Sequence, residues 1–140
     1  FSQQVKLAGG VLIVMTKVDA TKLTDWCDLT GTEIADGHLT VYKAVDDDLR
    51  SGQGFQYPIG SEGTDTKWRD DHSCGGGLHF SPTPSLARDH FRSATRFLEC
   101  VVAADEVRCI DSTKLKAPRA TVVREVTLFG APVEAMAVQS

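Results

Sequence analysis

The chain has 140 residues, of which 41% are hydrophobic and 24% are charged, and its formal net charge is −4. This length and composition are typical of one globular domain, and they exclude a disordered or collagen-like chain. The acidic balance excludes a nucleic-acid binder that is basic over its whole surface, while a local basic patch stays open.

The N-terminal segment carries an apolar run at residues 11–15, which is far shorter than the ~20 residues that a membrane-spanning helix needs. The run is also short for a signal peptide, and no small-residue cleavage motif follows it. It predicts either a buried strand or the remnant of a tag. We interpret residues 1–140 as a single domain, with residues 1–14 as a candidate tag or leader extension, and we expect no membrane partner.

The cysteines are spread through the sequence and show no dense disulfide framework. A domain of this length builds a core without disulfide support. The pattern therefore predicts reduced thiols in a cytoplasmic protein. The four residues are Cys27, Cys74, Cys100 and Cys109.

A short helix and a strand are predicted before the middle of the chain. Residues 21–29 carry apolar side chains at helical spacing, with Thr21 placed to cap the start of the helix and Gly31 to end it. Residues 39–45 alternate and are rich in β-forming side chains, which predicts a strand. Residues 46–77 are mostly polar and rich in glycine, and a loop of this length is usually functional or mobile.

The second half of the chain predicts a strand, a helix and then further strands. Residues 77–80 form the first strand, and Thr83 and Pro84 have the residue types that begin a helix. The later elements are strands at 96–102, 107–110 and 120–128, a turn at 130–132 and a hairpin return at 133–138. Together these predict an α+β fold of two small, mostly antiparallel sheets with short helices, in which the helix near Thr83 crosses the mouth between the sheets.

One cluster of potential metal ligands lies in the glycine-rich segment. His72, Cys74 and His79 carry side chains that bind zinc, but their spacing differs from that of zinc fingers, and the sequence has no Cys-x-x-Cys. Buried apolar cysteines, with histidines in a polar loop or a cleft, explain the same residues without a metal. A small zinc-supported domain is therefore kept as an alternative, and no metal ligand is assigned.

Several blocks of the sequence resemble a known enzyme family. They are Tyr42-Lys-Ala44, Gly75-Gly-Gly-Leu-His-Phe80, Ser85-Leu-Ala-Arg-Asp-His90 and Arg96-Phe-Leu-Glu-Cys-Val-Val102. Together they resemble the NAD-binding core of ADP-ribosyltransferases of the poly(ADP-ribose) polymerase type, over residues 39–102. The chain is also similar to a family of small actinobacterial and phage proteins that share the Tyr-Lys-Ala-Val and Cys-Gly-Gly-Gly-Leu-His-Phe-Ser-Pro segments.

The resemblance implies a binding site for NAD. Lys43 stands where the family has a ribose-binding histidine, and His79 and His90 stand at the positions of its two tyrosines. The cofactor-binding residues that the resemblance implies are Tyr42, Lys43, Gly77, His79, Ser81 and His90. The implied catalytic residues are His90 and Glu125, because Glu125 lies well inside a late strand.

The resemblance further implies transfer of ADP-ribose from NAD to a host macromolecule. This reaction breaks the nicotinamide–ribose bond through an oxocarbenium-like state, which requires a rigid nicotinamide pocket and a carboxylate near the developing positive charge. The replacement of the family's histidine and tyrosines favours a second hypothesis, in which the same fold binds or interacts without catalysis. The zinc-supported domain is the third hypothesis.

Overall fold

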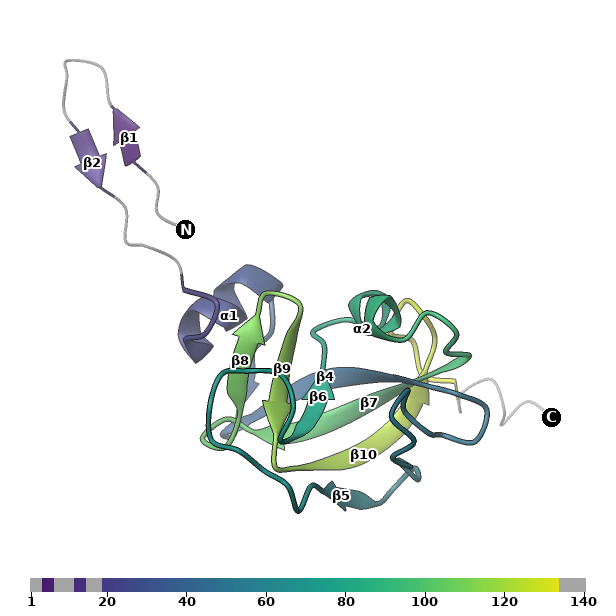
Figure 1. Cartoon of the computed structure of the whole chain (residues 1–140). Helices are drawn as coiled ribbons and strands as arrows, with labels where there is room; N and C mark the ends of the chain where they lie inside the picture. Colours follow the sequence, from purple (N-terminus) through teal and green to yellow (C-terminus); the bar gives the residue numbers. More distant parts are fainter. Residues whose placement is uncertain (1–3, 7–11, 15–18, 134–140) are drawn as a thin grey trace.

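The computed structural model describes residues 4–6, 12–14 and 19–133, which contain ten strands and two short helices (Figure 1). The helices are α1 (Leu23–Thr30) and α2 (Pro84–His90). The strands are β1 (Gln4–Lys6), β2 (Leu12–Val14), β3 (Ile34–Ala35), β4 (His38–Val45), β5 (Glu62–Thr64), β6 (Leu78–Phe80), β7 (Arg96–Ala103), β8 (Arg108–Asp111), β9 (Lys114–Ala117) and β10 (Arg119–Val126).

The strands form antiparallel sheets. The larger sheet has the order β3-β4-β7-β10-β5, the smaller sheet has the order β6-β9-β8, and β1 pairs with β2. Every strand pair within the described residues is antiparallel. This arrangement confirms the predicted α+β class with antiparallel sheets and short helices.

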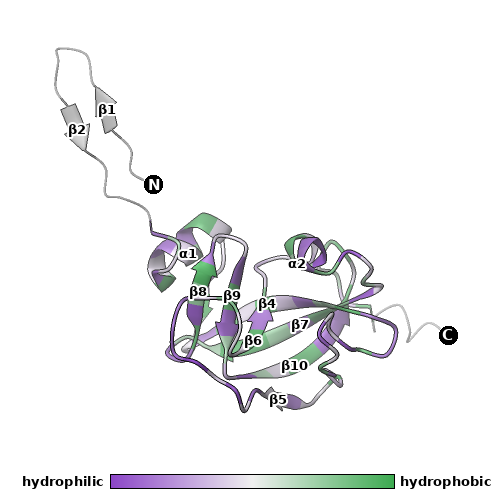
Figure 2. Ribbon diagram, in the orientation of Figure 1, coloured by the Kyte–Doolittle hydropathy of each residue, from purple (hydrophilic) through white to green (hydrophobic). Residues whose placement is uncertain are grey.

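The main core lies between the larger and the smaller sheet. Side chains of a strand point alternately to its two faces, and β7 accordingly buries Leu98, Cys100 and Val102 on one face. The smaller sheet contributes Phe80 and Leu115 to the same cluster. Figure 2 shows hydrophobic stretches along β7 and β8, whereas the long loop that carries β5 is mainly hydrophilic.

A second, smaller cluster lies beneath α2. Ala87 of this helix packs with Ala44, Phe97 and Val126 of the larger sheet. Because Phe97 is adjacent in sequence to Leu98, it points to the opposite face of β7. Helix α2 therefore packs on the face of the larger sheet that is turned away from the main core. Figure 1 shows the helix close to the end of β4.

The two helices differ in how well their ends were predicted. The Thr83 hydroxyl accepts a hydrogen bond from the backbone N–H of Leu86, with Pro84 at the first turn, so the predicted start of α2 is confirmed. The predicted end of α1 at Gly31 is also confirmed, since this glycine has a φ of 74°. The predicted cap at Thr21 is wrong, because α1 begins one residue beyond Lys22 and no side chain caps it.

Some strands follow the prediction and others were missed. Strands β4, β7, β8 and β10 lie within about one residue of the predicted ranges at most of their ends. Strands β3, β5 and β9 were not predicted. The predicted return at 133–138 falls almost entirely outside the described residues. Neither helix in the described segments has the length and apolar character that crossing a bilayer requires.

Candidate functional site

The two sheets meet at an isolated bridge between β4 and the end of β6. The Tyr42 N–H donates to the Ser81 carbonyl at 2.8 Å, and the Ser81 N–H donates back to the Tyr42 carbonyl at 2.9 Å. In an antiparallel strand, alternate residues direct their N–H and C=O groups to the same side. Ala44 therefore directs both groups away from β7, to the side on which Tyr42 meets Ser81.

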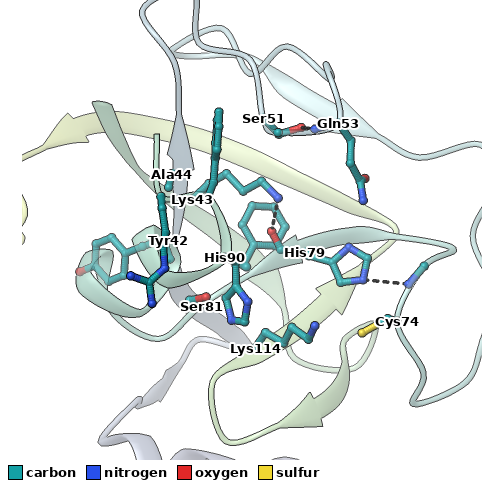
Figure 3. Close-up of a pocket in the computed structure, with 16 residues that line it drawn as sticks. Tyr42, Lys43, Ala44, Ser51, Gln53, Cys74, His79, Ser81, His90 and Lys114 are labelled. Atoms are coloured by element: carbon teal, nitrogen blue, oxygen red, sulfur yellow. Dashed lines mark hydrogen bonds between the residues drawn. The ribbon is translucent and has the colours of Figure 1, made fainter. Parts of the chain in front are cut away.

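A pocket of about 570 Å³ lies at this edge of β4 (Figure 3). It is lined by residues 42–44 of β4, 51–53 and 74–75 of the long loop, and 79–81 at the end of β6. Parts of α2, the two residues that follow it, and Lys114 of β9 complete the lining. The volume is in the range that binds small molecules and cofactors.

The charge of this pocket is opposite to that of the chain. Lys43, Arg92 and Lys114 line it, and no Asp or Glu is among its described lining residues, although the chain carries a formal net charge of −4. A concave site lined by one sign of charge raises the local concentration of the opposite sign. The pocket therefore favours an anionic ligand.

Lys43 is the most unusual of these cations. Its Nζ donates to the His79 carbonyl at 2.8 Å (Figure 3) and lies 5.5 and 5.8 Å from the ring centroids of Tyr57 and Phe80. No carboxylate of the described residues lies within ion-pair distance of it. Burial, aided by the nearby charge of Lys114, lowers the pKa of the Lys43 amine to about 8, although Cys100 opposes the shift.

His79 is a neutral ring in the wall of the pocket. Its Nε2 accepts a hydrogen bond from the Gly75 N–H at 3.1 Å, so the ring proton is on Nδ1. Burial lowers the pKa of His79 to about 4, and the charge of Lys43 adds to this effect. The histidine thus fixes the glycine-rich loop against β6.

A buried lysine on the neighbouring strand, directly opposite His79, holds the same loop. Lys116 is fully buried, and its Nζ donates to Asp71 Oδ1 at 2.6 Å and to the Gly75 carbonyl at 2.9 Å. The Nζ also lies 5.3 Å from the ring centroid of Trp68. These contacts position Gly75, which lines the pocket.

The predicted site residues separate into two groups. The pocket brings together Tyr42, Lys43, His79, Ser81 and His90, which come from β4, β6, α2 and the residue after β6. The imidazole of His90 is exposed, and its Nε2 shares a hydrogen bond with the Thr113 hydroxyl at 3.2 Å.

Gly77 and Glu125 are not among the residues that line the pocket. A Cβ atom at Gly77 would lie 2.8 Å from the Trp68 ring, so this glycine serves close packing in the loop. Glu125 forms a two-point ion pair with Arg96, with Nη2–Oε1 and Nε–Oε2 distances of 2.6 and 3.1 Å. This pair engages both oxygens of the carboxylate that the resemblance would make catalytic.

Two cations of the pocket were missed by the sequence reasoning. Lys114 belongs to β9, which was not predicted, and its short Lys-Leu-Lys-Ala segment gives little hydrophobic signal. Arg92 directly follows the predicted helix, so its sequence position was the available clue. Gln53 and Ser51 come from the loop, where sequence periodicity gives no information on position.

The two histidines among the candidate zinc ligands have other hydrogen-bond partners. His72 Nδ1–H donates to the Cys109 carbonyl at 2.8 Å, and His79 Nε2 accepts from the Gly75 N–H. Across the part of the chain that the structure describes, no group of three His, Cys, Asp or Glu side chains is arranged to hold a metal ion. All four cysteines are free thiols.

Comparison with known proteins places the chain in a family without adding a function. No curated protein and no solved structure matches it. Residues 39–133 match the family described as "Domain of unknown function (DUF7666)", and this range covers more than half of the chain and contains the β4 edge, α2 and Lys114. The chain belongs to this DUF7666 family.

Proposed function

We propose that the domain is a ligand-binding module whose pocket takes NAD or a related nucleotide. The observation that carries the proposal is the charge of the pocket: Lys43, Arg92 and Lys114 line it without a carboxylate among its described lining residues. Phosphate groups are the part of a nucleotide that such a set recognises, since charge-assisted hydrogen bonds from Lys and Arg to phosphate are strong.

The uncharged part of the lining suits the remainder of such a ligand. The backbone N–H and C=O of Ala44 offer one donor and one acceptor side by side, which complements a carboxamide such as that of nicotinamide. Tyr42 and His79 also line the pocket and supply ring surfaces to it. The resemblance to ADP-ribosyltransferases supports the same ligand, and an ADP-ribosyltransferase-like arrangement of the two sheets is part of this proposal.

Binding without transfer is the function that the geometry favours. Transfer of ADP-ribose requires a carboxylate that stabilises the developing oxocarbenium ion. Glu125, which the resemblance assigns to this role, is held by Arg96 outside the lining of the pocket. Replacing Glu125 is therefore expected to leave ligand binding unchanged.

Calorimetry with the full chain tests the proposal. We expect NAD to bind with a Kd below about 1 mM, inorganic pyrophosphate to compete with it, and Lys114→Ala to weaken binding about tenfold, which is ~1.4 kcal/mol. Lys67→Ala is the matched control, because Lys67 is exposed on the loop and does not line the pocket. Absence of NAD binding at millimolar concentration, or equal weakening by the control, would refute the proposal.

A further inference from the structure

The pocket contains an amine whose surroundings differ from those of an ordinary phosphate-binding lysine. Among the residues that the structure describes, the Lys43 Nζ has one hydrogen-bond acceptor, the His79 carbonyl, and two aromatic rings beside it. A lysine that is desolvated next to other cations is the usual form of a nucleophilic amine. Lys114, which also lines the pocket, is a cation whose charge acts on Lys43.

We propose that Lys43 is a nucleophile that forms a reversible imine with an aldehyde carrying a phosphate group. The aldehyde carbon would meet the amine at the edge of β4, while Lys114 and Arg92 would hold the phosphate. This activity goes beyond nucleotide binding and requires no NAD, so each can hold without the other.

The geometry supplies what the amine needs in order to react. The hydrogen bond to the His79 carbonyl can be donated by a neutral amine as well as by an ammonium ion, so loss of a proton leaves the side chain in place. No carboxylate of the described residues stabilises the ammonium form by an ion pair. The lowered pKa of Lys43, about 8, agrees with this geometry and makes the neutral amine accessible near neutral pH.

The proposed step balances without a further reactant. The neutral amine attacks the carbonyl carbon, a C–N bond forms, and the C–O π electrons move to oxygen. One nitrogen proton transfers to that oxygen to give a carbinolamine. The C–O bond then breaks, the second nitrogen proton leaves with the oxygen as water, and the C=N bond of the imine remains.

The contrast with Lys116 makes the assignment specific to one lysine. Lys116 is fully buried, and its amine is occupied by Asp71 and the Gly75 carbonyl. Lys67 is exposed and represents a surface amine. Selective reaction at Lys43 therefore separates the proposal from general lysine modification.

Borohydride trapping on the full chain tests the inference. The chain is incubated at about pH 8 with pyridoxal 5′-phosphate. A parallel sample receives pyridoxal, which lacks the phosphate group. Both samples are then reduced with borohydride, and the adducts are located by peptide mass spectrometry. We expect one dominant adduct, on Lys43. The phosphorylated probe should give it at concentrations about tenfold lower than pyridoxal does, because its phosphate would contact the pocket cations. The adduct yield should rise with pH around a midpoint near 8.

Variants complete the test. Lys43→Arg, checked for folding by thermal unfolding, should lose the dominant adduct, and Lys114→Ala should lower the yield on Lys43 without moving the adduct elsewhere. If Lys43→Arg does not fold, the wild-type peptide map decides alone. Adducts spread over exposed lysines such as Lys67 with Lys43 unmodified, or equal yields with the two probes, would overturn the inference. Trapping at Lys43 in a chain that does not bind NAD would refute only the proposed function.

Discussion

Two lysines, Lys43 in the pocket and Lys116 behind the glycine-rich loop, have opposite surroundings. Lys116 is fully buried and is matched by a carboxylate, a carbonyl and an aromatic ring. Lys43 is half-buried and is matched by one carbonyl and two rings, without a carboxylate in ion-pair distance among the described residues. The positive charge of Lys116 is therefore compensated within the protein. The positive charge of Lys43 is not, and an anionic ligand could compensate it.

The difference shows how one domain uses the same residue type for structure and for binding. A buried charge with good partners organises the segment that supplies those partners, and here the segment is the glycine-rich loop. A charge with incomplete partners destabilises the empty site and thereby favours a ligand that brings a negative charge.

Replacement of Lys116 is expected to have the largest effect on stability. Lys116→Met removes the buried cation that pairs with Asp71 and leaves the Gly75 carbonyl without its buried donor. Asp71 keeps its contacts with Arg69 and Ser73. We expect the free energy of unfolding, measured by urea denaturation, to fall by about 3 kcal/mol. This value is at the low end for breaking a buried ion pair, because Asp71 is half-exposed. Lys67→Met is the control, and a loss no larger than in this control would show that Lys116 does not organise the loop.

Replacement of Lys43, whose charge has no carboxylate partner among the described residues, is expected to stabilise the protein. The pKa of Lys43 falls from 10.5 to about 8 on folding, so folding penalises its charged form. This penalty is fully present below pH 8 and is relieved as the pH rises toward 10.5, where the unfolded chain also loses the proton. Lys43→Met should therefore raise the free energy of unfolding by about 2 kcal/mol at neutral pH, after allowance for the lost hydrogen bond.

The same denaturation series checks the pH dependence of this gain. The advantage of Lys43→Met should shrink between about pH 8 and 10.5. A variant that is less stable than wild type at neutral pH, or whose advantage grows with pH, would mean that the fold compensates the charge of Lys43 after all.

Replacement of His79 is expected to have a smaller effect, on the stability of the protein at acidic pH. Its pKa falls from 6.5 to about 4 on folding, so the unfolded chain binds the proton first and stability declines as the pH falls from 6.5 to 4. His79→Gln keeps an acceptor for the Gly75 N–H and does not titrate. The variant should lose about 1 kcal/mol less than wild type across this range, by thermal unfolding. Identical acid profiles would exclude a neutral His79 in the folded protein.

Weakening the ion pair between Glu125 and Arg96 is expected to have the smallest effect on stability. Glu125→Gln weakens the contact with the partly exposed Arg96, and we expect a loss of about 0.5–1 kcal/mol. NAD affinity, measured by calorimetry, should be unchanged. A clear drop in affinity would place Glu125 in the ligand site and revive a catalytic role for it.

The fold was predictable where local rules decide the structure. Strands β4 and β7 show regular alternation, and Thr83 with Pro84 begins α2 as capping chemistry dictates. Strand β9 was missed because Lys116 occupies a buried position of a four-residue strand. Its partner Asp71 is 45 residues away in the sequence, so no local pattern reveals that the charge is compensated.

The site was predictable only in part, for a related reason. Resemblance placed Lys43, His79 and His90 in one pocket, as the structure does. It said nothing of Arg92 and Lys114, because the charge of a pocket depends on which distant segments the fold brings together. The ion pair that occupies Glu125 is likewise a pairing of two strands that the sequence alone does not specify.

The titration of the Lys43 amine tests the central claim most directly. The side-chain amine can be followed by NMR of selectively labelled lysine in wild type and in Lys43→Arg, which identifies the signal. We expect a midpoint near pH 8 in the free protein, and an upward displacement when pyrophosphate occupies the pocket, because the anion stabilises the ammonium form. A midpoint at the ordinary value of 10.5 in the free protein would contradict the account.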